Sequence, residues 1–222
     1  MSAVEAVLLD AGGVLVLPNP WAVTSVLRAA GGIIEPADVT RLHYKATAAM
    51  DAARDGDWKR YNNVLINHAG VPPARVDDVS AGLFELYTAP AATLWNVVPD
   101  GLVADLKALA ETGVEIAVVS NSDGTVEALL RMLGVPIDII IDSSVVGFAK
   151  PQPEIFGFAL EKLGVAPKHA LHVGDTAWAD VDGAHAAGVR PLHLDPYGDC
   201  PDADGHHEHL RSLADVVALV TG

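Results

Sequence analysis

The sequence is poor in cysteine, in basic residues and in long apolar runs, and each shortage excludes a class of protein. Cys200 is the single cysteine of the 222 residues, so an internal disulfide is excluded and a reducing compartment is favoured. Half of the residues are apolar, yet no apolar stretch reaches membrane-spanning length. The segment Met1–Glu5 has no basic region before the first apolar run, so we expect no secretory signal peptide and a cytoplasmic location.

The shortage of basic residues gives the chain a strongly acidic balance. Lysine and arginine together number 14 against 29 aspartates and glutamates, for a formal charge of -15. Such a field repels nucleic acid and anionic membranes, so we expect neither as a partner. It also repels a phosphorylated metabolite at long range. Any anion site must therefore be built locally, from a cation, a lysine and backbone N–H groups.

The texture of the sequence changes twice along the chain. Residues 4–9 form an apolar run typical of a short buried strand, and Pro18-Asn19-Pro20 then interrupts the chain. Residues 18–92 have helical texture without a clear strand. From residue 93 onwards, apolar strands alternate with helical stripes. The pattern predicts a discontinuous α/β core, residues 1–17 and 93–222, with an inserted helical domain at residues 18–92.

The alternating part of the chain predicts a parallel sheet with helices on both faces. Its expected strands lie at residues 114–119, 137–141, 170–173 and 190–194. Glycines such as Gly113, Gly134 and Gly164 end the helical stripes between these strands.

Four short motifs carry chemically active side chains, and three of them lie where predicted strands end. They are Asp10-Ala11-Gly12-Gly13, Ser120-Asn121, Lys150-Pro151, and Gly174-Asp175 followed by Asp180. Each motif alone has an ordinary explanation, because aspartate and serine commonly cap turns and helices and lysine is commonly a solvated surface residue. The carboxyl ends of the strands in an open α/β sheet are nevertheless where ligands bind.

Taken together and in this order, the four motifs resemble those of the haloacid dehalogenase superfamily, whose members are mostly magnesium-dependent phosphatases. The resemblance implies a Rossmann-like core with the Asp10 strand central and a helical cap over the site. It implies that Asp10 attacks phosphorus to form an aspartyl-phosphate. The Ser120 hydroxyl and the Asn121 N–H would hold the phosphoryl oxygens, and Lys150 would offset the negative charge. A small phosphorylated metabolite is the expected substrate.

The resemblance also implies a Mg²⁺ site built from oxygen atoms. Asp10 and Asp175 are the expected direct ligands, Asp180 binds directly or through water, and the backbone carbonyl of Gly12 supplies a further ligand. Several carboxylates brought together would repel one another, and a hard cation relieves that repulsion.

Gly12 is the one departure from the family's pattern. The phosphatases carry a second aspartate at this position, which protonates the leaving oxygen and then activates water, a contribution of about 10²–10⁴-fold. Two readings follow: a phosphatase that manages without this acid, or a catalytically weak or silent fold that binds a phosphorylated ligand or a protein partner. A metal-free dehalogenase is disfavoured by the acidic fourth motif, and no phosphonatase lysine frame surrounds Lys45 or Lys59.

A phosphatase of this kind has three ways to manage without the second aspartate. The first is a leaving group that departs without help from an acid, as in an acyl phosphate or an activated aryl ester. The second is a substrate that supplies its own acid, and the third is an acid supplied by the helical insert. Candidates in the insert are His43, Lys45, Asp57, Tyr61 and His68. Trp21 is expected either to line the cleft or to lie in the core.

One further cluster, Gly205-His206-His207-Glu208-His209, has metal-binding residue types. The sequence favours a polar loop here, because no neighbouring residue in the chain completes a closed site. Cys200 is interpreted as an incidental loop thiol rather than a reactive one.

Overall fold

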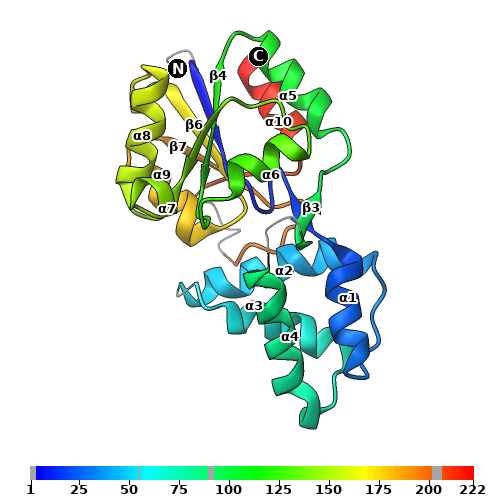
Figure 1. Cartoon of the computed structure of the whole chain (residues 1–222). Coiled ribbons are helices and arrows are strands. Elements are labelled where there is room, and N and C mark those ends of the chain that lie inside the picture. The colour runs from blue at the N-terminus through cyan, green and yellow to red at the C-terminus, as the bar shows by residue number, and fades with distance from the viewer. Residues whose placement is uncertain (1–3, 55, 90–92, 202–206) are drawn as a thin grey trace.

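The computed structural model describes residues 4–54, 56–89, 93–201 and 207–222. A six-stranded parallel sheet lies at its centre, in the order β5-β4-β1-β6-β7-β8 (Figure 1). The strands are β1 (Ala6–Leu9), β4 (Glu115–Ser120), β5 (Ile139–Asp142), β6 (Ala170–Gly174), β7 (Arg190–Leu194) and β8 (Glu208–Leu210). The fold class and the central place of the Asp10 strand are confirmed.

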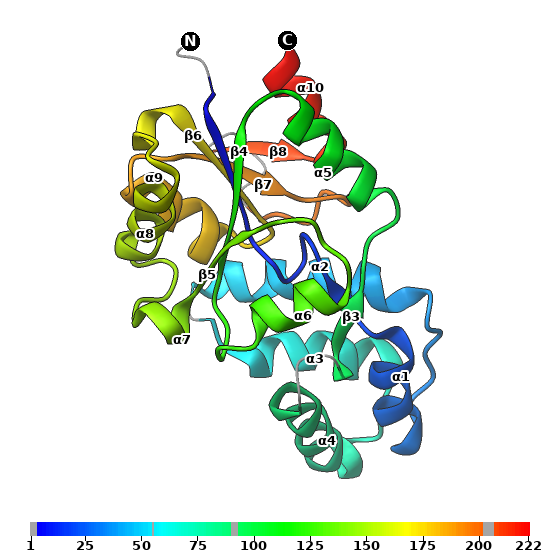
Figure 2. The ribbon, with the colours of Figure 1, turned by 45° about the horizontal axis from the view of Figure 1, so that its top comes forward.

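The side chains of β1 alternate between the two faces of the sheet and so define two cores. Val7 and Leu9 pack in one core with α5 (Leu102–Glu111), α6 (Val126–Met132) and α10 (Leu213–Thr221). Ala6 and Leu8 pack in the other core with α8 (Pro153–Leu163) and α9 (Asp182–Ala186). β1 is completely buried because helices cover both faces, which explains its unbroken apolar sequence (Figure 2).

The register of β1 brings the functional motifs to one edge of the sheet. Leu9 pairs with Val118 on β4 and with Val173 on β6. Asp10, Ser120 and Gly174 therefore all lie at the carboxyl ends of adjacent strands. A short helix, α7 (Ser143–Val146), and a π-helical turn, Ala177–Val181, follow β5 and β6 at the same edge.

Residues 20–88 form a helical unit that faces this edge in both views (Figures 1 and 2). Its helices are α1 (Pro20–Ala29), α2 (Asp38–Ala53), α3 (Trp58–Ala69) and α4 (Val76–Thr88), and they enclose an apolar core of their own. A two-stranded antiparallel ribbon, β2 (Leu17–Pro18) with β3 (Trp95–Val97), connects the helical unit to the sheet. The predicted domain boundary at residue 92 lies outside the described residues.

The structure differs from the sequence-based expectation near the carboxyl terminus. Residues 208–210 form the edge strand β8 rather than a polar loop, because they pair with β7 in register from Leu192 to Leu194. Gly205 and His206 of the predicted cluster lie outside the described residues. Among the helices of the described chain, none has the length and apolar character needed to cross a membrane.

Candidate active site

Asp10 and Lys150 form the centre of the candidate site. The Lys150 Nζ lies 2.7 Å from Asp10 Oδ1 and 2.7 Å from Asp180 Oδ1, so one buried ammonium joins the first and fourth motifs. Burial raises the pKa of Asp10 to about 7, although Lys150 opposes that shift. Burial works against the ammonium too, but the two carboxylates outweigh it and raise the pKa of Lys150.

Asp180 is held by hydrogen bonds to both of its oxygens. Oδ1 accepts hydrogen bonds from Lys150 and from His172 Nε2, at 2.7 and 2.9 Å, and Oδ2 accepts from the amide and hydroxyl of Thr176. Burial would raise the pKa of Asp180, but Lys150 and His172 outweigh it and hold the pKa well below its usual range. Asp180 is therefore a fixed anion that orients Lys150 toward Asp10.

Asp175 is the carboxylate with unused binding capacity. It is buried, and its Oδ2 has no hydrogen-bond partner among the described residues. His43 Nε2 lies 3.1 Å from this oxygen, but outside hydrogen-bonding geometry, so the contact is an ion-pair distance only. Three buried aspartates, Asp10, Asp175 and Asp180, face one buried lysine, and their oxygens lie within 4.8 Å of one another. This donor set and its charge imbalance fit a hard divalent cation.

The second motif lies beside the lysine. Ser120 ends β4 and is buried at the cavity wall. The side chain of Asn121 bridges to the lysine segment, because its amide donates to the Lys150 carbonyl and its oxygen accepts the Lys150 N–H, at 2.9 and 2.7 Å. Asn121 thus fixes the backbone that carries Lys150.

Two glycines are required by close approach to the aspartates. Gly13 has a φ of 74°, and a Cβ there would lie 2.2 Å from Asp175 Oδ2. A Cβ at Gly174 would lie 2.0 Å from the Asp180 carboxyl carbon. Gly12 is different. A Cβ there would meet only the Trp95 ring, at 3.6 Å, which is ordinary van der Waals contact, so the backbone at this position tolerates a side chain.

A cavity of about 310 Å³ opens over these residues, between the sheet edge and the helical unit. Asp10, Ser120, Asn121, Lys150, Asp175 and Asp180 all line it. Three tryptophans form much of the remaining wall: Trp58, Trp95 and Trp178.

The expectation that Trp21 lines the cleft or lies in the core was wrong on both counts. Its side chain is 69% exposed on α1, because Pro20 and Asn19 start the helix there and turn the indole outward.

Among the five candidate residues of the helical unit, only His43 lines the cavity. It is 2% exposed, and its Nδ1 lies 2.9 Å from the Tyr61 hydroxyl. Tyr61 is thus brought near the site through His43. Lys45 and His68 are exposed on the helices, and Asp57 caps α3 by accepting the Lys59 N–H.

Sequence reasoning missed Asp51, which joins the helical unit to the sheet edge. Its two oxygens accept the N–H groups of Ala177 and Trp178, at 2.7 and 3.0 Å. Burial raises the pKa of Asp51 to about 7, and these hydrogen bonds oppose that shift. The available signal was weak: Asp51 follows His43 by eight residues, and so lies on the same face of a helix.

His172 was missed as well, and its signal was stronger. It interrupts an otherwise apolar strand that leads directly to Asp175, and a completely buried histidine requires a polar partner. Burial lowers its pKa, so the neutral ring donates from Nε2 to Asp180.

The fold and the site together define a Rossmann-like α/β protein with an aspartate–lysine centre at the carboxyl edge of its sheet. A family model described as haloacid dehalogenase-like hydrolase matches residues 4–188. The chain belongs to this family of hydrolases.

Curated relatives and a solved structure agree with the family. The mouse haloacid dehalogenase-like hydrolase domain-containing protein 3 is 38% identical over 60% of this chain and 53% of its own length. A ribulose-1,5-bisphosphate 5-phosphatase from Halopiger xanaduensis is 31% identical over 70% of this chain and 65% of its own length. The match therefore spans about half to two thirds of these relatives.

The solved structure covers the whole chain. It is a haloacid dehalogenase (HAD) family hydrolase from Deinococcus radiodurans, with bound phosphate and sodium. The match covers 100% of this chain and 97% of that chain, with a TM-score of 0.66 and 25% sequence identity.

Proposed function

We propose that the protein is a magnesium-dependent phosphatase that acts on a small phosphorylated metabolite through an aspartyl-phosphate at Asp10. The observation that carries this proposal is the Asp10–Lys150–Asp180 arrangement beside the unpartnered oxygen of Asp175. Phosphatases among the relatives support the same reaction class.

In the first half of the reaction, an Asp10 oxygen forms a bond to phosphorus while the bond from phosphorus to the leaving oxygen breaks. Water then attacks phosphorus, which releases inorganic phosphate and regenerates the Asp10 carboxylate. Lys150 lies within hydrogen-bond distance of Asp10 and offsets the negative charge that gathers there. The Ser120 hydroxyl and the Asn121 N–H hold phosphoryl oxygens at the end of β4.

Asp10, Asp175 and the Gly12 carbonyl would hold Mg²⁺, which supplies charge neutralisation for the phosphoryl group. Both oxygens of Asp180 already accept hydrogen bonds, so Asp180 acts through water or through its hold on Lys150.

The helical unit acts as a cap that excludes water from the cavity, as closing elements do in many hydrolases. His43 is the side chain of this cap that we assign to proton transfer in place of the missing aspartate. Its place in the cavity wall supports this role, and Tyr61 orients its ring.

The tryptophans of the cavity narrow the substrate class. Trp58, Trp95 and Trp178 offer flat apolar surfaces on which a planar or aromatic leaving group can stack. The leaving groups of aryl and acyl phosphates also depart readily without a strong general acid. This agrees with the lack of an acidic side chain at Gly12. We therefore propose that the substrate is a phosphate of an aromatic or otherwise stabilised leaving group.

The test is phosphate release from a panel of aryl, acyl and sugar phosphates, with and without Mg²⁺. We expect magnesium-dependent release that is fastest for aryl or acyl phosphates and that stops with chelator. Asp10→Asn keeps the size of the side chain and should abolish turnover in a folded protein. Turnover that survives in this variant would refute the nucleophile, and phosphate release that persists with chelator would refute the magnesium dependence.

Gly12 supports a second candidate function, a weakly active or silent fold that binds a phosphorylated ligand. The Trp95 ring packs against the position from which the family's second acid would extend. A folded protein that binds phosphate esters but releases phosphate from none of the panel would favour this candidate over the enzyme.

A further inference from the structure

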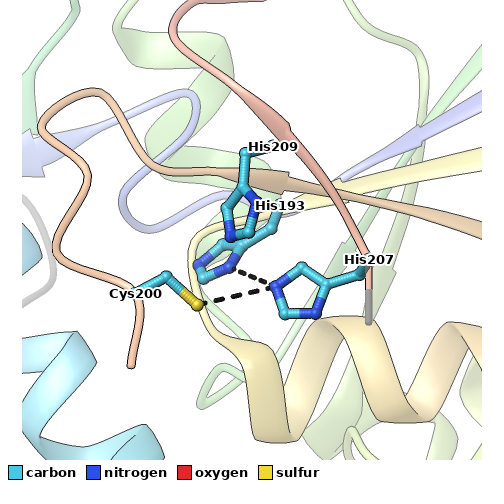
Figure 3. A group of neighbouring side chains, drawn as sticks. All are labelled: His193, Cys200, His207 and His209. Atoms are coloured by element: carbon cyan, nitrogen blue, oxygen red, sulfur yellow. Dashed lines mark hydrogen bonds between the residues drawn. The ribbon is translucent and has the colours of Figure 1, made fainter. Parts of the chain in front are cut away.

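Outside the candidate active site, the structure brings together three histidines and the single cysteine. They are His193, Cys200, His207 and His209 (Figure 3). His193 lies on β7 and pairs in register with His209 on β8, so both side chains emerge on the same face of the sheet. His207 lies just before β8, and its ring centroid is 4.6 Å from that of His209, so the two rings lie side by side. Cys200 comes from the loop after β7.

The ligand atoms of these four side chains are close enough to share one metal ion. All lie within 4.8 Å of one another. His193 Nδ1 lies 3.0 Å from His207 Nε2, and Cys200 Sγ lies 3.6 Å from the same nitrogen. A tetrahedral zinc with Zn–N of about 2.1 Å and Zn–S of about 2.3 Å separates neighbouring donors by about 3.4–3.6 Å. The observed distances between the ligand atoms, from 3.0 Å to no more than 4.8 Å, include these values.

The ring of His193 is oriented for coordination by its other nitrogen. His193 Nε2 lies 3.2 Å from the backbone carbonyl oxygen of Asp175. A carbonyl only accepts, so Nε2 carries the proton and Nδ1 directs its lone pair toward the cluster. Metal-binding histidines typically donate their second N–H in this way.

His209 provides an independent indication that a ligand belongs here. Its Nε2 is buried and has no hydrogen-bond partner among the residues that the structure describes. A buried polar atom without a partner costs free energy. Coordination by this imidazole orders the ring and offsets that cost.

The loop that carries Cys200 is held in place by Asp195. The carboxylate of Asp195 accepts the N–H groups of Gly198 and Asp199, at 2.8 and 2.9 Å, and of Cys200, at 3.3 Å. These bonds turn the chain back so that Cys200 is buried against β7. The thiol is therefore positioned by its own loop.

From this geometry we propose that His193, Cys200, His207 and His209 form a structural zinc site. Thiolate and imidazole ligands are the set that zinc prefers, and four protein ligands close the coordination sphere. His193 and Cys200 are 3% and 6% exposed, and none of the four lines the catalytic cavity, so the site is separate from that cavity. On binding, Cys200 loses its S–H proton to solvent and a zinc–sulfur bond forms.

The zinc fastens the edge strand β8 and the Cys200 loop to β7. Through the His193–Asp175 hydrogen bond, it also stiffens the backbone that carries Asp175. The proposal does not depend on phosphatase activity, because the site is defined by residues outside the cavity.

Cobalt substitution gives a direct test. Untagged protein, stripped with chelator, is titrated with Co²⁺ in excess Mg²⁺, and the thiolate-to-cobalt charge-transfer band is followed. Because Cys200 is the only cysteine, this band can arise only from it. We expect a band that saturates at one Co²⁺ per chain, that Zn²⁺ displaces, and that is lost in Cys200→Ser. It should be retained in His185→Gln, which changes an exposed histidine on α9.

A second measurement uses the native metal. Elemental analysis of untagged wild-type protein should give one zinc per chain, and His207→Gln should lose it. Cys200 in the wild type should react with a thiol reagent slowly with zinc bound and much faster after chelation, which tests the site even where a variant fails to fold. Absence of both the band and zinc protection would overturn the proposal, as would zinc that stays bound in a folded Cys200→Ser variant.

Discussion

Gly12 lies two positions after the proposed nucleophile, and its conformation is ordinary rather than strained. Its φ is not in the left-handed region, and a Cβ at this position would meet the Trp95 ring at 3.6 Å as its nearest contact. The absence of a carboxylate at this position is thus not imposed by the backbone. It is a chemical difference, and it can be reversed by a single substitution.

Gly12→Asp should therefore raise the turnover of phosphate esters with poor leaving groups. General acid–base help at this position is expected to add up to about 10²-fold to kcat for alkyl phosphates, to the extent that His43 does not already supply it, with little change for acyl phosphates. Gly12→Asn is the matched control, because it adds the same volume without the acid. Equal rates for the two variants would show that the carboxyl group contributes nothing.

His43→Gln should show the opposite selectivity. If His43 transfers the proton, its loss lowers kcat for poor leaving groups by about 10²-fold and leaves good leaving groups nearly unchanged. The leaving-group dependence of kcat is the measurement. His68→Gln, an exposed histidine on α3 with a 3.9 Å contact to Asp38, is the control and should leave that dependence unaltered. A uniform loss across all substrates would assign His43 to positioning of Asp175 instead.

Among the elements, α2 makes the closest connection between the helical unit and the sheet edge. It carries His43, which lies beside Asp175, and Tyr44, which reaches the Gly13 carbonyl. It also carries Asp51, which binds the turn after Asp175. The Tyr44 hydroxyl donates to Gly13 at 2.7 Å. One helix thus contacts both the loop after Asp10 and the fourth motif.

Asp51→Ala should loosen this connection measurably. It leaves the Ala177 and Trp178 N–H groups without their acceptor, and a lost partner of this kind costs roughly 1–3 kcal/mol. Hydrogen exchange at these two amides should accelerate about tenfold to a hundredfold. Asp77→Ala, an exposed aspartate of α4, is the control and should leave both amides unchanged. Unchanged exchange in Asp51→Ala would show that other contacts hold the turn.

Most of the sheet was predictable because its strands are mainly apolar runs that end in glycine turns or polar motifs. β7 was predicted at its observed bounds, and β1, β4, β5 and β6 within two residues. β8 was not predictable, because its histidines and glutamate are typical of a polar loop and only pairing with β7 makes them a strand. The positions of Asp10, Ser120 and Asp175 follow from strand order. Those of His43, Asp51 and Trp95 depend on how the helical unit docks, which no local pattern encodes.

At the scale of the whole molecule, the charge of -15 opposes the proposed anionic substrate. The local cations act over short distances, whereas the acidic surface acts over the Debye length, which falls from about 30 Å at 0.01 M salt to about 8 Å at 0.15 M. The rate at which a phosphate dianion encounters the site should therefore rise as salt is added.

We expect kcat/KM for a phosphate dianion to rise a few-fold over this range of salt at saturating Mg²⁺. The change should appear in KM, with kcat nearly constant, because screening affects encounter rather than the chemical step. A fall in kcat/KM with salt would show that the local cations, rather than the net charge, govern approach.

The ribbon of β2 and β3 has a consequence for exchange of the helical unit between relatives. The chain enters and leaves that unit through two strands that pair with each other, Leu17 with Val97 and Pro18 with Trp95. Because Trp95 also forms part of the cavity wall, the exit strand belongs both to the junction and to the binding surface. A chimera that replaces residues 20–88 and keeps both strands would retain the Trp95 wall of the host enzyme, and one that also replaces β3 would exchange it. The residue at which the two sequences are joined, before or after β3, therefore determines which parent protein supplies this part of the cavity wall.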